Sequence, residues 1–285
     1  MQMLKPYAQR ILRSVGLHDR LRVSSVYDAY WKIADQNRIR NRDTEVRFYH
    51  DLLDGFLPGD LIFDIGANAG EKTDIFLRLG AHVVAVEPDD HNQEVLRRKF
   101  VKYRVTPKPV VIVDRAVSDS VGIATMWIDS PGSALNTLSE KWADALKGDD
   151  ERRTAHPRDK LEFKQTKDVR TTTLDELISS HGTPLFIKID VEGFELQVLR
   201  GLSRPVAYLS FEVNVPQFRA DALQGLDLLQ SLSGDGQFNY AADCKRGLAL
   251  EQWVDRAKFA DVLRGCTEGC IEVFWRSRVA RGAKA

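Results

Sequence analysis

The sequence predicts a doubly wound α/β fold, in which helices cover both faces of a mostly parallel β-sheet. Short apolar runs alternate with amphipathic segments along most of the chain, and many of these runs end in an acid, an asparagine or a glycine. The runs indicate seven strands, of which the last two form a hairpin-like return. The chain has 285 residues, 43% of them hydrophobic, so it can bury a core of this size.

Residues 61–88 read LIFDIGANAGEKTDIFLRLGAHVVAVEP, which predicts a strand, a tight turn, a helix and a second strand. A βαβ unit of this kind binds nucleotide-like ligands at its first turn. Gly66 and Gly70 lack a Cβ atom, so the backbone can turn sharply there and approach a ligand closely. Asp64 and Glu87, at two strand ends, are therefore candidates for hydrogen-bonding the ligand.

The turn departs from the G-x-G-x-x-G pattern of dinucleotide sites, because Asn68 replaces the middle glycine and Glu71 the third. Asp64 and Glu71 disfavour a diphosphate and favour a cationic amino-acid group. Glu87 follows Asp64 at roughly the spacing, about 20 residues, at which an acid binds a ribose diol. These features argue against a nicotinamide-dependent oxidoreductase and favour a sulfonium nucleoside.

Residues 1–55 differ from the rest, and we expect a helical arm there, ahead of one domain at residues 56–285. Residues 1–47 hold ten basic and five acidic side chains, with apolar residues at helical spacing. Such an arm could rest on a membrane surface or an acidic partner. The alternative that we favour is a helix that packs on the domain and keeps its basic face in solvent.

Residues 91–103 predict a helix, and residues 110–113 predict a third strand that ends at Asp114. That strand end also faces the ligand crevice of a doubly wound sheet, where an acid commonly meets an adenine amino group. Residues 122–129 alternate loosely and predict a hairpin strand. A densely charged insertion near residues 147–167 is expected to be either a mobile lid or a disordered loop.

Residues 184–193 read PLFIKIDVEG and predict a strand that ends in two acids and a glycine. A helix at 195–201 and a strand at 206–214 follow, and the last two strands are expected at 238–250 and 270–276 with a helix containing Trp253 between them. Because the carboxyl ends of parallel strands meet at one edge of a sheet, their polar residues should converge on one crevice. These residues are Asp64, Glu87, Asp114, Asp190, Glu192, Glu212 and Asn214.

Six segments together resemble the FkbM family of methyltransferases. They are DIGANAG at 64–70, VEP at 86–88, AVSD at 116–119, TTLDEL at 172–177, KIDVEGFELQVLRG at 188–201 and FEVN at 211–214. The resemblance implies a class I methyltransferase (Rossmann-like) fold, with a seven-stranded, mostly parallel sheet flanked by helices. It also implies S-adenosylmethionine as the methyl donor and, usually, O-methylation of a hydroxyl on a glycan, polyketide or other secondary metabolite.

The residues expected to bind the donor come from two sources. The resemblance to the family implies that the residues of the glycine turn and Glu87 bind the donor, and Ser133 and Asn136 match the family less closely. Asp114 and Asp190 are also expected to bind it, because they lie at strand ends that face the crevice. The full set is Asp64, Gly66, Asn68, Gly70, Glu87, Asp114, Ser133, Asn136 and Asp190.

The candidate catalytic residues are Asp190, Glu192 and Lys188. Methyl transfer is an in-line displacement that needs an aligned hydroxyl and a place for its proton, which the two carboxylates could supply. Lys188 shares a strand face with Asp190, and a lysine inside a sheet must be paired. A structural ion pair between Lys188 and Glu212 is the alternative interpretation. His156, in the charged insertion, is a further candidate base.

Three other hypotheses stay open to different degrees. No metal is assigned, but Asp190, Glu192 and Glu212 could hold a divalent ion that acidifies a hydroxyl. A nucleic-acid methyltransferase is disfavoured, because the DVEG sequence at 190–193 replaces the N/D-P-P-Y/F motif on which a flipped base would stack. A non-catalytic binding or scaffold protein that keeps the cofactor pocket is the main competing hypothesis.

Charge and cysteine content narrow the choice of partner. Lys+Arg and Asp+Glu both number 41, so no global attraction to nucleic acid is expected. Cys244, Cys266 and Cys270 suit reduced thiols better than a disulfide framework or a zinc site. With no signal-peptide pattern or membrane-length apolar run, we expect a cytoplasmic protein that acts on a small-molecule or glycan hydroxyl, with a homodimer as one option.

Overall fold

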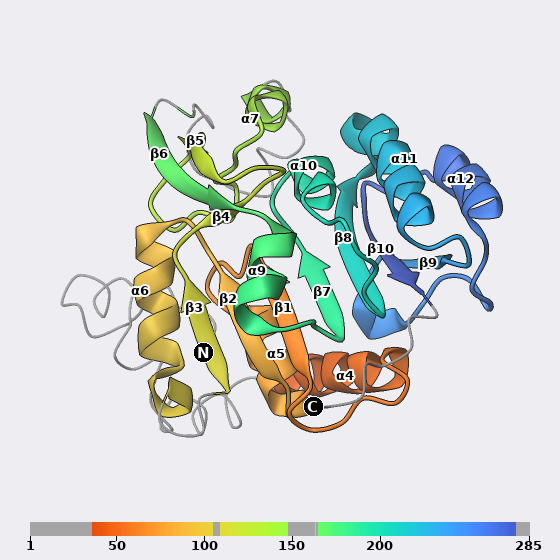
Figure 1. Ribbon diagram of the computed structural model, residues 1–285, viewed down its shortest axis with the longest axis horizontal. Helices are drawn as coiled ribbons and strands as arrows, with labels where there is room; N and C mark the ends of the chain where they lie inside the picture. Colours follow the sequence, from red (N-terminus) through yellow and green to blue (C-terminus); the bar gives the residue numbers. More distant parts are fainter. Residues whose placement is uncertain (1–35, 105–108, 148–162, 164, 278–285) are drawn as a thin grey trace.

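The computed structural model describes residues 36–104, 109–147, 163 and 165–277 (Figure 1). Most of the expected arm and most of the charged insertion, including His156, lie outside the described residues. The interpretations given above for those parts therefore stay predictions.

A seven-stranded sheet forms the centre of the domain, in the order β3-β2-β1-β7-β8-β10-β9 (Figure 1). Among these strands β10 alone runs antiparallel to its neighbours, and the other pairs are parallel. The predicted fold class is thus confirmed, including the return of the chain in the last pair. The strands are β1 (Leu61–Ile65), β2 (His82–Val86), β3 (Val110–Val113), β7 (Phe186–Ile189), β8 (Tyr208–Asn214), β9 (Gln237–Ala241) and β10 (Cys270–Arg276).

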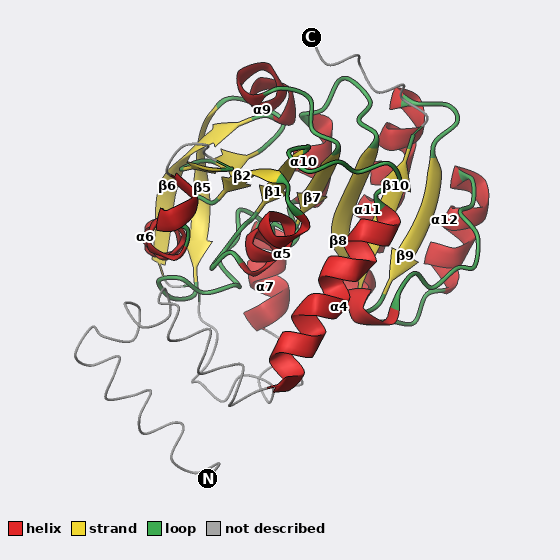
Figure 2. Ribbon diagram, turned by 90° about the horizontal axis from the view of Figure 1, so that it is seen from below, coloured by secondary structure: helices red, strands yellow, loops and turns green. Residues whose placement is uncertain are grey.

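Helices cover both faces of this sheet (Figure 2). One face, with Phe63 and Ile187, packs against α9 (Leu174–His181), α10 (Glu195–Arg200), α11 (Val215–Leu232) and α12 (Arg256–Gly265). The other face, with Ile62 and Phe186, packs against α4 (Gln36–Leu52), α5 (Glu71–Leu79) and α6 (Asp90–Lys99). Successive side chains of a strand point to opposite faces, so a strand covered on both faces is mostly apolar, and the charged Asp64 of β1 and Lys188 of β7 are exceptions. Within the described ranges, none of the helices is both long enough and apolar enough to cross a bilayer.

Helix α4 is fixed to the domain through one buried tyrosine. The ring of Tyr49 lies 5.0 Å from that of Phe76 and is fully buried. Its hydroxyl donates a hydrogen bond to Glu272 on β10 over 3.4 Å. The same carboxyl group accepts hydrogen bonds from the Ser210 hydroxyl at 2.6 Å and the Cys244 thiol at 3.1 Å. Residues on α4, β8 and the C-terminal part of the chain therefore meet at Glu272.

A smaller sheet lies beyond the carboxyl ends of the main strands, beside α7 (Glu140–Lys147) (Figure 1). It has the order β4-β6-β5, built from β4 (Ala116–Val117), β5 (Gly122–Ile128) and β6 (Gln165–Thr172). The predicted hairpin strand corresponds to β5, which pairs antiparallel with β6. The charged insertion was expected to run to 167, but β6 already starts at Gln165. Its first charged side chains face solvent, while its backbone pairs with β5.

The C-terminal elements are shorter than the sequence indicated. Strand β9 ends at Ala241 rather than near residue 250, because the chain turns into the short helix η2 (Cys244–Arg246). Helix α12 begins behind Asp255, whose side chain accepts a hydrogen bond from the amide of Lys258. Trp253, expected within this helix, precedes it.

The predicted helix at 91–103 is divided into α6 and the short helix η1 (Val101–Arg104).

Two turns at the carboxyl edge of the sheet touch each other. The turn after β1 contains Gly66, with φ of +79°, and the turn after β7 contains Asp190. A Cβ atom on Gly66 would lie only 1.8 Å from the carbonyl oxygen of Asp190. Glycine is therefore required at this position both by backbone conformation and by the close approach of the second turn.

Gly66→Ala should lower the unfolding free energy by about 3 kcal/mol or more, because it adds both backbone strain and overlap with Asp190. Gly59 offers a matched control, since its φ is +92° but no atom lies within 4 Å of a Cβ built there. Gly59→Ala should cost only about 1 kcal/mol. Urea denaturation followed by circular dichroism measures both losses, and equal losses would contradict the importance of the contact between the turns.

Candidate active site

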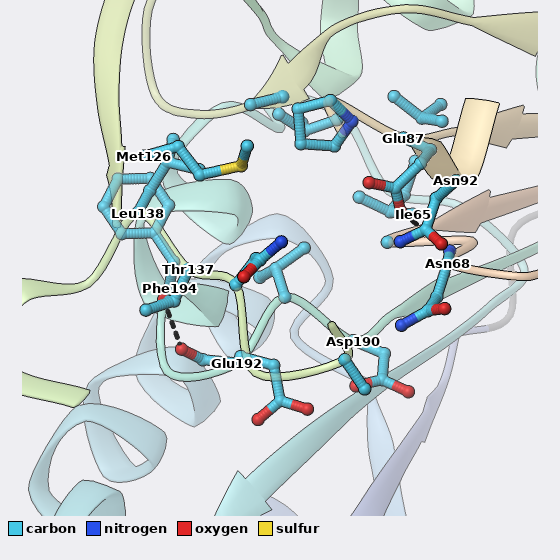
Figure 3. Close-up of a pocket in the computed structure, with 18 of the residues that line it drawn as sticks. Ile65, Asn68, Glu87, Asn92, Met126, Thr137, Leu138, Asp190, Glu192 and Phe194 are labelled. Carbon is cyan, nitrogen blue, oxygen red and sulfur yellow. Dashed lines mark hydrogen bonds between the residues drawn. The ribbon is translucent and has the colours of Figure 1, made fainter. Parts of the chain in front are cut away.

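A pocket opens where β1, β2 and β7 end, and the segment after β5 closes its other side (Figure 3). The structure brings seven of the predicted site residues to its lining. They are Gly66, Asn68, Glu87, Ser133, Asn136, Asp190 and Glu192. Asp64, Gly70, Asp114 and Lys188 do not line it. In Figure 3, Glu87 lies at one end of the pocket and Asp190 and Glu192 lie at the other.

Glu87 is held in place by backbone amides on both sides. Its Oε2 accepts a hydrogen bond from the Asn68 amide at 2.7 Å, and its Oε1 accepts one from the Asp89 amide at 2.8 Å. A carboxylate has about four acceptor positions, so further ones are available for the two hydroxyls of a ribose. Burial raises the pKa of Glu87 to about 7, against the opposing effect of the two amides.

The glycine turn is supported from below by Lys99 on α6. The Lys99 ammonium group donates hydrogen bonds to the carbonyls of Ala69 and Gly70, at 2.9 and 2.6 Å. A Cβ atom on Gly70 would lie 2.6 Å from both Leu96 and Phe100, so this glycine lets the turn pack on α6. The structure therefore gives Gly70 a packing contact behind the pocket rather than a position in its lining.

Asp64 also lies behind the pocket. It is 1% exposed and accepts a hydrogen bond from the Thr73 hydroxyl at 2.5 Å, which links β1 to α5. Burial raises the pKa of Asp64, although the charge of Lys188 opposes this shift. In this structure Asp64 thus orients the helix that follows the glycine turn.

Asp114 turns away from the pocket, and its neighbour Arg115 enters the lining instead. The Asp114 carboxylate accepts a hydrogen bond at 2.7 Å from the guanidinium group of Arg170 on β6. Strand β3 ends at Val113, so strand alternation no longer fixes which of the next two residues faces the pocket. The expectation that Asp114 meets the adenine is not supported by this geometry.

An apolar wall that sequence reasoning missed completes this side of the pocket. Ala116 and Val117 of β4, Met126 of β5 and Leu138 line it. Such a surface suits the flat face of an adenine base. Residues 116–119 contribute only to the family resemblance, with no strand predicted there, and no signal in the sequence showed that Met126 and Leu138 come to the same wall.

Lys188 forms an ion pair with Asp190, whose Oδ2 lies 2.7 Å from its ammonium nitrogen. The predicted alternative, a pair with Glu212, is therefore replaced by a partner two residues away on the same strand face. Lys188 is 2% exposed, and burial alone would lower its pKa. The charges of Asp190, Glu272 and Asp64 outweigh burial and raise that pKa, so Lys188 stays protonated and cannot serve as a base.

Two acids of the pocket lining, Asp190 and Glu192, lie close to a third acid, Glu212, which does not line the pocket. One oxygen each from Asp190, Glu192 and Glu212 lies within 4.8 Å of the others. Burial and the charges of Asp190 and Glu212 raise the pKa of Glu192. Burial raises the pKa of Glu212 to about 7, with a further contribution from Asp190. Such a cluster can accept hydrogen bonds from hydroxyls, take up a proton, or bind a divalent cation.

Glu195 shapes the turn that carries two of these carboxylates, and sequence reasoning did not single it out. Its Oε1 accepts hydrogen bonds from the amides of Val191 and Gly193, each at 3.2 Å. Glu192, between them, has a left-handed φ of +55°. Burial raises the pKa of Glu195 to about 8. Its place in the KIDVEGFE sequence was the available signal, because an acid at a helix start often bonds nearby amides.

The strands have the order of a class I, S-adenosylmethionine-dependent methyltransferase. The pocket also fits that class, because Glu87 can accept hydrogen bonds from ribose hydroxyls and an apolar wall can contact the adenine base. Residues 64–233 match the methyltransferase FkbM domain, and the chain belongs to this family.

Individual relatives are distant. The hexuronic acid methyltransferase AglP of Haloferax volcanii is 26% identical over 200 residues, which cover 70% of each chain. A TehB-like S-adenosylmethionine-dependent methyltransferase from Corynebacterium glutamicum has a TM-score of 0.41 and 11% identity, over 88% of this chain and 100% of that one. Precorrin-6y C5,15-methyltransferase from Geobacter metallireducens has a TM-score of 0.40 and 8% identity, over 82% and 86% of the two chains.

The buried acids predict a specific pH dependence. Their raised pKa values mean that the folded protein binds more protons than the unfolded chain between about pH 4.5 and 8, so stability should fall as pH rises through this range. Because the cationic donor favours ionised carboxylates, its stabilising effect should grow over the same range. Thermal unfolding from pH 5 to 8, with and without S-adenosylmethionine, measures both trends.

Glu87→Gln should flatten part of this dependence and weaken donor binding. Glu94→Gln is the matched control, because Glu94 is exposed on α6 and pairs with Arg98. A melting temperature that rises over this range in the wild type, or equal effects of the two variants, would refute the assignment.

Proposed function

We propose that this methyltransferase transfers the methyl group to a hydroxyl oxygen of a glycan, a polyketide or another secondary metabolite. The observation that carries the proposal is the cluster of Asp190, Glu192 and Glu212, of which Asp190 and Glu192 line the donor pocket at the end away from Glu87. S-adenosylmethionine, when bound, supplies a methyl group on a sulfonium sulfur. The protein must then align an acceptor lone pair with that methyl group and receive the acceptor proton.

Asp190 is the best placed of the three carboxylates for orienting the hydroxyl. It lines the pocket, and its ion pair with protonated Lys188 fixes the direction of its carboxylate. Lys188 is thus a positioning residue in this scheme. Glu192 also lines the pocket, and its raised pKa makes it a suitable proton acceptor as the hydroxyl is methylated.

The charge of the cluster supports a hydroxyl rather than a carboxylate as the acceptor group. A carboxylate acceptor would approach three acidic side chains, and the charge of Lys188 beside them is already paired with Asp190. The relative AglP is named a hexuronic acid methyltransferase, which supports a carbohydrate acceptor for this chain without distinguishing its hydroxyls from its carboxylate. A sugar offers hydroxyls that can donate hydrogen bonds to carboxylates.

The test is transfer of radiolabelled methyl from S-adenosylmethionine to glycan and natural-product extracts. Asp190→Asn and Glu192→Gln should each lower transfer to the labelled acceptor by about a hundredfold or more, the usual range for general acid–base groups. Asp168→Asn is the control, because that residue lies on β6 and bonds Thr125 at the exposed surface. Donor binding without transfer to any hydroxylated acceptor would instead favour a non-catalytic binding protein.

Chelation tests whether the three carboxylates work through a divalent ion. We expect transfer to persist after exhaustive treatment with EDTA, since Asp190 is paired with Lys188 and the other two carboxyl groups have raised pKa values. Loss of transfer, with recovery on adding Mg²⁺ or Mn²⁺, would instead assign the cluster to a metal.

A further inference from the structure

The roof of the donor pocket is a single segment, residues 129–139, which connects β5 to α7 and is called the strap here. Five of its residues line the pocket: Ser133, Ala134, Asn136, Thr137 and Leu138. Two neighbouring side chains of the strap, Asn136 and Thr137, hold different parts of the site.

Asn136 uses its amide group within the protein. Its Nδ2 donates hydrogen bonds to the Asp89 carboxylate at 3.1 Å and to the Ser130 carbonyl at 3.0 Å. Its Oδ1 accepts a hydrogen bond from the Asp129 amide at 2.9 Å. Both amide hydrogens therefore already have partners. A hydrogen bond donated by Asn136 to S-adenosylmethionine would therefore require breaking one of these bonds, and only Oδ1 keeps a free acceptor position.

Asp89 connects the strap to the acid expected to bind the ribose. One of its carboxylate oxygens accepts the bond from Asn136, and the other accepts the Asn92 amide at the start of α6, at 3.0 Å. The amide of Asp89 donates to Glu87 at 2.8 Å. A displacement of the strap can therefore change the position of Glu87, because Asp89 is hydrogen-bonded to both Asn136 and Glu87.

Thr137 fastens the strap to the opposite side of the pocket. It is 2% exposed, and its hydroxyl donates a 2.7 Å hydrogen bond to the backbone carbonyl of Glu192. The backbone of Thr137 also pairs with Trp127 of β5, through N–O distances of 2.7 and 3.1 Å. Adjacent residues of the strap thus bind opposite sides of the pocket: Asn136 bonds Asp89, next to Glu87, and Thr137 bonds Glu192.

We propose that Asn136 is a positioning residue, which sets the affinity for S-adenosylmethionine by locking the strap to Asp89 and donates both of its amide hydrogens within the protein. This inference rests on membership of the methyltransferase family and does not depend on the proposed hydroxyl acceptor. The bond is directional, because an amide N–H₂ group donates and a carboxylate oxygen accepts. Exchanging the two side chains should therefore preserve it.

The test is a side-chain exchange, measured as the dissociation constants of S-adenosylmethionine and S-adenosylhomocysteine by calorimetry. Asn136→Asp places two carboxylates together and should weaken binding of both ligands by about tenfold or more. Asp89→Asn should also weaken it, because the carboxylate accepts from both Asn136 and the Asn92 amide, whereas an asparagine replaces one of those two oxygens with an N–H₂ group. The double variant restores an N–H group facing a carboxylate between positions 89 and 136 but not the bond to the Ser130 carbonyl, so it should bind more tightly than Asn136→Asp alone, by about threefold or more.

Thr125→Val is the matched control, because it removes a hydrogen bond to Asp168 on the same small sheet, away from the pocket. It should leave both dissociation constants unchanged. Melting temperatures separate loss of affinity from loss of folding, and Asn136→Ala provides a milder variant should the charged one unfold. Wild-type affinity in Asn136→Asp, or losses that merely add in the double variant, would overturn the proposal. Failure of the wild type to methylate hydroxyls would leave these binding results unaffected.

Discussion

The close approach of two turns is the constraint on which the rest of the site depends. Gly66 in the turn after β1 leaves room for the backbone carbonyl of Asp190 in the turn after β7. This contact brings the end that carries Asn68 next to the end that carries the carboxylates. Since both turns start from adjacent parallel strands, their distance is set by the sheet, and only the absence of a side chain allows them to meet.

The sequence predicts the parts of this protein that follow from strand periodicity. The seven-stranded sheet and the position of Glu87 at the end of β2 could be read from apolar runs that end in polar residues. That Arg115 rather than Asp114 lines the pocket could not be predicted, because the alternation of side chains ceases where β3 ends. The partner of Lys188 depends on side-chain direction within a crowded cluster, which spacing alone does not specify. Likewise, Met126 and Leu138 reach the pocket only through the pairing of a second sheet.

Buried polar groups in this fold are organised in two sets. Behind the pocket, Asp64 and Glu272 each accept hydrogen bonds from neutral donors and fix helices α5 and α4. At the end of the pocket away from Glu87, Glu192 and the neighbouring Glu212 have raised pKa values, and one oxygen of each lies within 4.8 Å of the other. The first set is satisfied by the protein, so it stabilises the fold. The second retains acceptor capacity, which suits binding of a ligand.

The carboxylate cluster also bears on how the enzyme can release its product. Transfer of the methyl group converts a sulfonium cation into a neutral thioether, so the bound cofactor loses one positive charge during the reaction. In the proposed scheme the sulfonium lies near Asp190, Glu192 and Glu212, so that loss would remove a favourable electrostatic interaction. In this scheme the acids that attract S-adenosylmethionine hold S-adenosylhomocysteine less tightly, and the weaker binding favours release of the product after each transfer.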